Sequence, residues 1–273
     1  MTGSTKVRNT AERGPAGWGA PCEALLTAAD GTRVHAAHRP GPAGAATAFV
    51  VAHGFTGAVE RPAVRRAARV FARHGAVVTF SFRGHGRSGG LSTVGDREVL
   101  DLRAAVGWAR SLGHRRVATV GFSLGGAVVV RHAALYGGVA AVAAVSAPAR
   151  WYYRGTAPMR RLHRLVMHPV GRGVARYGLR TRIDPQEWTA LPVPPVEAAA
   201  RLGGTPLLVV HGDRDAYFPL DHPRSLHAAA RAAGGDAELW IEPGFGHAEN
   251  AADEPLLDRI GARLARWAAE GTA

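Results

Sequence analysis

The stretch that most constrains the fold runs from Val117 to Gly126 and reads VATVGFSLGG. Its first four residues, 117–120, have strand character and stop at a glycine, and an alanine- and valine-rich segment typical of a helix follows. Residues 121–125 form a G-x-S-x-G pattern, which places Ser123 in a sharp turn from strand to helix. Such a turn strains the serine backbone and requires flanking glycines because the chain packs too tightly for a Cβ. The alternative, a glycine-rich turn with an incidental serine, is disfavoured by the flanking strand and helix.

Apolar strands alternate with helices along most of the chain. Besides 117–120, continuous apolar strands are expected at 48–52, 76–82, 139–145, 206–210 and 237–241. Apolar residues at helical spacing separate most of them, and a hairpin around Asp30-Gly31 precedes them. Strands without alternation are buried on both faces, so the pattern predicts an α/β fold with a mostly parallel central sheet and helices on both faces.

This alternation breaks between residues 148 and 202, where prolines and short helical stretches replace clear strands. A segment of this length between two strands predicts a short helical cap insertion at about 149–202. Residues 1–20 are polar and rich in glycine and proline, which predicts a loose N-terminal tail. Residues 21–273 are then expected to form a single domain that carries the cap.

The composition excludes several classes of protein. No apolar run is long enough to span a bilayer, and a signal-peptide core is missing, so a cytoplasmic location is expected. The single cysteine, Cys22, excludes an internal disulfide. The net charge is +13 and comes almost entirely from arginine, but no nucleic-acid-binding motif accompanies it. We therefore expect no specific nucleic-acid partner; association through the arginines would depend steeply on salt.

Four further motifs follow predicted strands: HGFTG at 53–57, RGHGRSGG at 83–90, HGDRDAYFP at 211–219 and GFGH at 244–247. With the serine turn, and in this order, they make the chain resemble the alpha/beta-hydrolase fold family from about Cys22 to Trp267. Within that family the chain is most similar to the monoacylglycerol-lipase and serine-aminopeptidase-like hydrolases with a compact cap. The family order of serine, acid and histidine is also met.

The resemblance implies a catalytic triad. Ser123 would be the nucleophile, and it needs a neighbouring proton acceptor because a serine hydroxyl attacks weakly at neutral pH. His247, on a glycine-flanked loop after the last strand, would be that base. The family pattern HG-x-x-D-x-x-[V]-P places the acid at Asp215, with Phe218 in the usual valine position. Asp213 is the alternative acid.

The resemblance also implies an oxyanion hole made by the backbone N–H groups of Phe55 and Leu124. The second of these groups opens a helix, whose N-terminus favours negative charge. His53 would either orient the HGFTG loop or be a packed structural histidine. The loop from Arg83 to Gly90 is expected to support the floor of the site.

The predicted cap is basic: nine arginines and no acidic residue fall between 150 and 182. One hypothesis is that this segment makes weak contact with an anionic membrane surface and passes acyl chains to Ser123. The other is that an amphipathic cap helix packs on the domain and exposes a solvated basic face.

These observations predict a cofactor-free serine hydrolase that cleaves carboxylic esters, lipid-like or with small acyl groups, through an acyl-enzyme. No metal is expected, because neither an H-E-x-x-H motif nor a cysteine cluster is present. Amide, peptide or thioester cleavage, or acyl transfer, on the same triad is the alternative. A non-catalytic binding protein on this fold is disfavoured by the intact triad.

Overall fold

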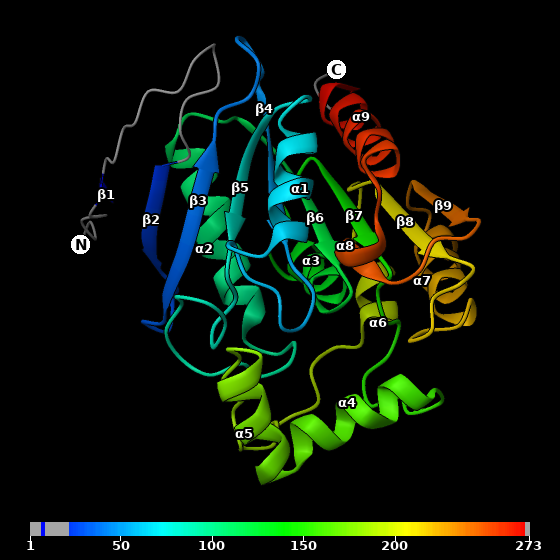
Figure 1. Ribbon diagram of the computed structural model, residues 1–273. Helices are drawn as coiled ribbons and strands as arrows, with labels where there is room; N and C mark the ends of the chain where they lie inside the picture. Colours follow the sequence, from blue (N-terminus) through cyan, green and yellow to red (C-terminus); the bar gives the residue numbers. More distant parts are fainter. Residues whose placement is uncertain (1–6, 9–21, 271–273) are drawn as a thin grey trace.

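The computed structural model describes residues 7–8 and 22–270, and within them the strands form one sheet (Figure 1). The order across the sheet is β1-β2-β3-β5-β4-β6-β7-β8-β9. Pairing from β5 to β9 is parallel, whereas β1, β2 and β3 add an antiparallel edge. The strands are β1 (Val7–Arg8), β2 (Cys22–Thr27), β3 (Arg33–Arg39), β4 (Thr47–Ala52), β5 (Ala76–Phe80), β6 (Arg116–Phe122), β7 (Ala141–Val145), β8 (Leu207–Gly212) and β9 (Ala237–Glu242). The predicted mostly parallel α/β sheet is confirmed.

Helices cover both faces of this sheet, as the continuous apolar strands require. One face packs against α1 (Pro62–Phe71) and α9 (Glu254–Glu270), with α8 (Ala248–Ala251) at its edge. The other face packs against α2 (Glu98–Ser111), α3 (Leu124–Tyr136), α6 (Pro195–Ala199) and α7 (Asp221–Ala232). In β4, Phe49 and Val51 enter the first core and Val50 and Ala52 the second, so every side chain of this strand is buried.

Two further helices, α4 (Ala157–Met167) and α5 (Pro169–Gly178), lie beyond the sheet, at the bottom of Figure 1. Thr156 caps the N-terminus of α4: its hydroxyl accepts a hydrogen bond from the N–H of Met159 and donates one to the Tyr217 carbonyl, 2.9 Å away. These helices fall inside the predicted cap insertion at about 149–202, and we retain the division into one domain with such an insertion as a proposal.

The structure differs from the sequence expectations at several element ends. Strand β6 continues past Val120 to Phe122, because Gly121 and Phe122 still pair with Ala144 and Val145 of β7. Strand β5 ends at residue 80 rather than 82, and β7 begins at 141 rather than 139. The expected tail at 1–20 lies outside the described residues except for Val7 and Arg8, which pair with β2 where a loose segment was predicted.

Within the described residues, no helix is both long enough and apolar enough to cross a membrane.

The close packing around Gly121 yields a test of the serine turn. A Cβ at this position would lie 2.1 Å from the carbonyl oxygen of Gly125, so we expect Gly121→Ala to lower the free energy of unfolding by roughly 1–3 kcal/mol. The matched control is Gly107→Ala on α2, where a Cβ meets nothing within 4 Å. There we expect a gain of roughly 0.5–1 kcal/mol, because alanine favours a helix interior. Urea unfolding measures both, and equal effects of the two substitutions would contradict the packing argument.

Candidate functional site

Ser123 occupies a strained turn between β6 and α3. Its backbone has φ +50° and ψ −113°, a conformation that non-glycine residues rarely adopt. The N–H of Ser123 donates a 2.8 Å hydrogen bond to Val145, and a Cβ at Gly125 would lie 2.3 Å from the Ala52 carbonyl oxygen. The neighbouring strands therefore impose the turn predicted from the G-x-S-x-G pattern.

The structure brings together three predicted residues that lie far apart in the sequence. The His247 Nε2 atom is 2.9 Å from the Ser123 Oγ atom, and His247 Nδ1 is 2.7 Å from Asp215 Oδ2. A carboxylate accepts but does not donate, so His247 Nδ1–H donates to Asp215, and Nε2 lies next to the Ser123 hydroxyl. The Tyr217 ring stacks on the imidazole at a centroid distance of 4.3 Å.

The carboxylate that contacts His247 is that of Asp215, not that of Asp213. The Asp215 carboxylate is fully buried, and its Oδ1 accepts hydrogen bonds from the N–H groups of Tyr217 and Phe218 at 2.8 and 3.1 Å. Burial opposes ionisation, but the hydrogen bond and charge of His247 outweigh it and hold the pKa of Asp215 below its ordinary value. Asp213 instead accepts from the N–H of Gly244 at 2.7 Å, at the surface.

A second histidine lies behind this acid. His211 is fully buried at the end of β8, where its Nε2 lies 2.9 Å from the Phe218 carbonyl oxygen and 3.4 Å from Asp215 Oδ2. Nε2–H therefore donates to the carbonyl. Sequence reasoning did not assign His211 a role, although it opens the motif that contains the acid.

The HGFTG loop follows β4 and passes beside Ser123. His53 is fully buried, its Nε2 accepts the Phe82 N–H at 3.0 Å, and its Nδ1–H therefore donates to the Gly54 carbonyl at 2.6 Å. Burial, with the nearby His85, lowers the pKa of His53 to about 3, so the ring is neutral. His53 is thus both a packed histidine and a contact of the loop. Phe55 and Ser123 line the same cavity, and Leu124 begins α3, where its N–H has no partner within the helix.

The loop from Arg83 to Gly90 contributes a buried ion pair. The Arg83 guanidinium lies 2.8 Å from the buried Asp101 and 2.7 Å from Asp30. Arg83 therefore connects the β2–β3 turn to α2, and the support of the site floor by this loop stays a prediction.

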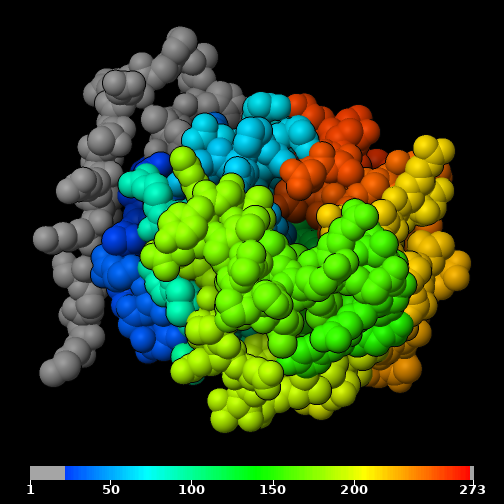
Figure 2. All heavy atoms as spheres, turned by 60° about the horizontal axis from the view of Figure 1, so that its bottom comes forward, coloured from blue at the N-terminus to red at the C-terminus, as the bar shows by residue number. Residues whose placement is uncertain are grey.

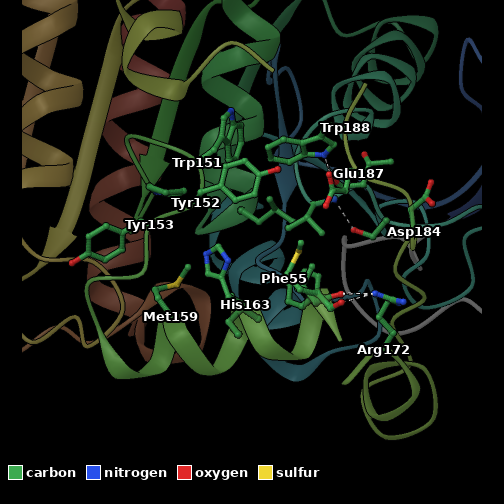
Figure 3. Close-up of a pocket in the computed structure, with 18 of the residues that line it drawn as sticks. Phe55, Trp151, Tyr152, Tyr153, Met159, His163, Arg172, Asp184, Glu187 and Trp188 are labelled. Carbon is green, nitrogen blue, oxygen red and sulfur yellow. Dashed lines mark hydrogen bonds between the residues drawn. The ribbon is translucent and has the colours of Figure 1, made fainter. Parts of the chain in front are cut away.

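A cavity of about 360 Å³ opens from Ser123 toward α4 and α5 (Figure 3). In the described part of the chain, it is lined by six of the protein's nineteen tryptophan, tyrosine and phenylalanine residues: Phe55, Trp151, Tyr152, Tyr153, Trp188 and Phe218. Trp151 and Trp188 meet edge to face at 5.5 Å. Their indole N–H groups donate to the carbonyls of Pro192 and Thr93, which fixes both rings.

Helix α4 forms the opposite wall of the cavity with Met159, Leu162, Val166 and Met167. The charged residues Arg172, Asp184 and Glu187 gather at one side of the cavity (Figure 3). Figure 2 shows the side of the molecule that lies at the bottom of Figure 1. Helices α4 and α5 cover its middle, and a hollow lies where they meet the orange segment near residue 250. The sequence indicated the helical spacing of the apolar cap residues but not that they face Ser123.

Comparisons with known proteins agree with this architecture. Residues 47–158 match the model of the alpha/beta hydrolase fold family. A monoacylglycerol lipase from Mycolicibacterium smegmatis is 30% identical over 229 residues, which cover 72% of this chain and 80% of that protein. The chain belongs to the alpha/beta hydrolase fold family. It is an esterase- or lipase-like alpha/beta hydrolase, as the order of its motifs predicted.

Two further relatives of this alpha/beta hydrolase differ in how much they cover. A putative carboxymethylenebutenolidase from Yersinia pestis is 29% identical over 168 residues, which span 60% of this chain but only 50% of that protein. The structure of an esterase from Pyrococcus furiosus superposes with a TM-score of 0.72 at 20% identity, over 92% of this chain and 91% of the other. The likeness to the Pyrococcus furiosus esterase, at this low identity, shows a shared fold.

Three buried histidines predict how stability depends on pH. Burial lowers the pKa of His53 to about 3 and those of His132 and His222 to about 4, from an ordinary value of 6.5. Between pH 6.5 and about 4 the unfolded chain binds these protons and the folded chain does not. We therefore expect the free energy of unfolding to fall as the pH is lowered through this range.

The variant His132→Leu isolates one such group, because neither ring nitrogen of His132 has a hydrogen-bond partner among the described residues. We expect the variant to take up roughly one proton fewer on unfolding, measured from urea unfolding at a series of pH values. A pH dependence equal to that of the wild type would contradict the buried, neutral state of this ring.

Proposed function

We propose that this protein hydrolyses carboxylic esters through an acyl-enzyme formed on Ser123, with His247 as general base and Asp215 as its partner. The observation that carries the proposal is the unbroken chain of contacts from Asp215 to His247 to Ser123, at 2.7 and 2.9 Å, which ends in the cavity. The similarity to a monoacylglycerol lipase supports the same class of reaction.

In the first half of the reaction, Ser123 Oγ attacks the ester carbonyl while His247 Nε2 takes its proton. The carbonyl oxygen becomes an oxyanion, which would be bound by the backbone N–H groups of Phe55 and Leu124. The intermediate collapses, His247 returns the proton to the leaving alkoxide, and an alcohol departs. In the second half His247 takes a proton from water, the hydroxide attacks the acyl-enzyme, and the acid leaves as the serine regains its proton.

Asp215 holds the ring in the tautomer that this sequence requires. Its carboxylate fixes Nδ1–H and stabilises the imidazolium that forms when Nε2 accepts a proton. The aromatic and aliphatic lining of the cavity favours an ester with an apolar acyl or alcohol group over a small polar one. Lipid-like and small acyl esters both fit this description.

The triad makes a testable prediction with an internal control. We expect Ser123→Ala to lose esterase activity by about 10⁶-fold and all labelling by a fluorophosphonate. Asp215→Asn leaves Nδ1–H without its carboxylate and should lower kcat by roughly 10⁴-fold. Asp213→Asn, two residues away and in contact with Gly244 rather than His247, should retain the wild-type rate. Hydrolysis of p-nitrophenyl esters measures all three.

Two outcomes would contradict the proposal. One is an alanine variant that still turns over esters or is still labelled. The other is a larger loss of kcat in Asp213→Asn than in Asp215→Asn, which would identify Asp213 rather than Asp215 as the partner of His247. Aminoacyl anilides cleaved faster than any ester in a chain-length series would favour the amide-cleaving alternative.

We also propose that the cap makes weak contact with anionic surfaces. On α5, Val170, Val174 and Tyr177 lie at helical spacing and are 71, 54 and 82% exposed. Helix α5 itself carries Arg172 and Arg176, two of the nine arginines of residues 150–182, and exposed apolar groups next to basic ones suit the interface of an anionic membrane.

Vesicle sedimentation tests this contact. We expect the protein to sediment with vesicles containing anionic lipid and not with neutral vesicles, and to be released by salt because the attraction is screened. The variant Val170→Ser/Tyr177→Ser should bind less while retaining its activity on a soluble ester. Equal, low binding to both kinds of vesicle would leave the other interpretation, a solvated basic face.

A further inference from the structure

Glu249 is a buried carboxyl that connects two loops of the site. It lies on α8, the short helix that begins directly after His247, and is 5% exposed. Its Oε1 accepts a 2.9 Å hydrogen bond from the N–H of Gly54, in the HGFTG loop 195 residues earlier in the chain. One short helix therefore follows the histidine and reaches the loop that contains Phe55.

The contact between Glu249 and Gly54 is tight, and a side chain at Gly54 would require the carboxyl to shift by a few tenths of an ångström. A Cβ there would lie 3.0 Å from Glu249 Oε2 and 3.2 Å from Oε1. Helix α8 is itself fixed to α1, because the Arg66 guanidinium donates a 2.6 Å hydrogen bond to the backbone carbonyl of Glu249. The Glu249 carboxyl therefore contacts Gly54 from a helix whose backbone is hydrogen-bonded to α1.

The next peptide bond, from Gly54 to Phe55, is also held. Its carbonyl oxygen accepts from His53 Nδ1–H at 2.6 Å and from the N–H of Gly57 at 2.9 Å. In a trans peptide the carbonyl and the N–H point in opposite directions, so the Phe55 N–H faces away from these two donors. Glu249 holds the N–H on one side of Gly54, and His53 and Gly57 hold the carbonyl on the other.

We propose that Glu249 is a positioning residue: it fixes the Gly54–Phe55 peptide so that the Phe55 N–H is placed for the oxyanion, and it couples this loop to the loop of His247. The inference rests on the proposed function, because it assigns the Phe55 N–H to the oxyanion hole. A preorganised donor stabilises the transition state more than the bound ester, so its placement acts on kcat rather than on KM.

The variants separate the acceptor from the bulk of the side chain. Glu249→Met fills a similar space but offers no strong acceptor to Gly54, whereas Glu249→Gln keeps an oxygen at the same place. Burial raises the pKa of Glu249 and so favours its neutral form, which glutamine resembles. Asn250→Ala, on the same helix with an exposed side chain, is the control.

We expect Glu249→Met to lower kcat by roughly 10–100-fold, less than the full loss of a donor because His53 still holds the peptide. KM should stay within about threefold of the wild type. Glu249→Gln should recover most of the lost kcat, and Asn250→Ala should leave it unchanged. Rates are taken per active site, titrated with a fluorophosphonate, so that misfolded protein does not lower the measured kcat.

A trifluoromethyl ketone gives a second readout. Ser123 Oγ adds to its carbonyl while His247 Nε2 takes the hydroxyl proton, and the resulting hemiketal oxyanion occupies the place of the transition-state oxygen. We expect Glu249→Met to raise the inhibition constant by the same factor by which it lowers kcat/KM. If Glu249 had a purely structural role, Glu249→Met would lower the melting temperature and the titrated fraction of active sites. The inhibition constant of the ketone and kcat/KM per active site would then stay unchanged.

Three results would overturn this role of Glu249. They are a wild-type kcat per active site in Glu249→Met, unchanged inhibition by the ketone, and a loss in Glu249→Gln as large as in Glu249→Met. The outcome is separable from failure of the triad. If Ser123→Ala is inactive while Glu249→Met keeps its kcat, only the positioning role is lost, whereas an active Ser123→Ala removes the mechanism itself.

Discussion

The structure depends on the turn at which β6 becomes α3. Around Ser123 the chain passes so closely that Gly121 and Gly125 each face a backbone carbonyl where a Cβ would stand. The serine therefore adopts a backbone conformation that most residues avoid. Helix α3 begins at the next residue, so the N-terminal end of this helix, with its partial positive charge, lies beside Ser123. Ser123 lines the cavity in this conformation.

Parallel strands explain why the partners of Ser123 meet it. The strands β4, β6, β8 and β9 run in one direction, so the segments that follow them gather at one edge of the sheet. These segments carry, in turn, Phe55, Ser123, Asp215 and His247. The cap helices α4 and α5 cover the same edge and turn the exposed site into an apolar cavity. Glu249 and His53 each form a hydrogen bond with Gly54 of the HGFTG loop.

The sequence was sufficient for the parts that depend on local chemistry. Continuous apolar runs located the central strands, and the motif order located Ser123, His247 and Asp215, which the structure places in contact. The end of β6 was misplaced because glycine weakens a strand interior, whereas pairing with β7 continues through Gly121 to Phe122. The role of Glu249 and the aromatic walls could not be predicted, since they arise from contacts between distant segments that no spacing reveals.

The central claim is that an ester carbonyl is attacked by Ser123 while its oxygen is held by two backbone N–H groups. A crystal structure of the protein inactivated by an alkyl phosphonate tests this most directly, because the adduct has the shape of the tetrahedral intermediate. We expect phosphorus bonded to Ser123 Oγ, with one phosphonyl oxygen about 2.7–3.1 Å from the nitrogens of both Phe55 and Leu124. Phosphorus on another residue, or an oxygen turned away from both nitrogens, would contradict it.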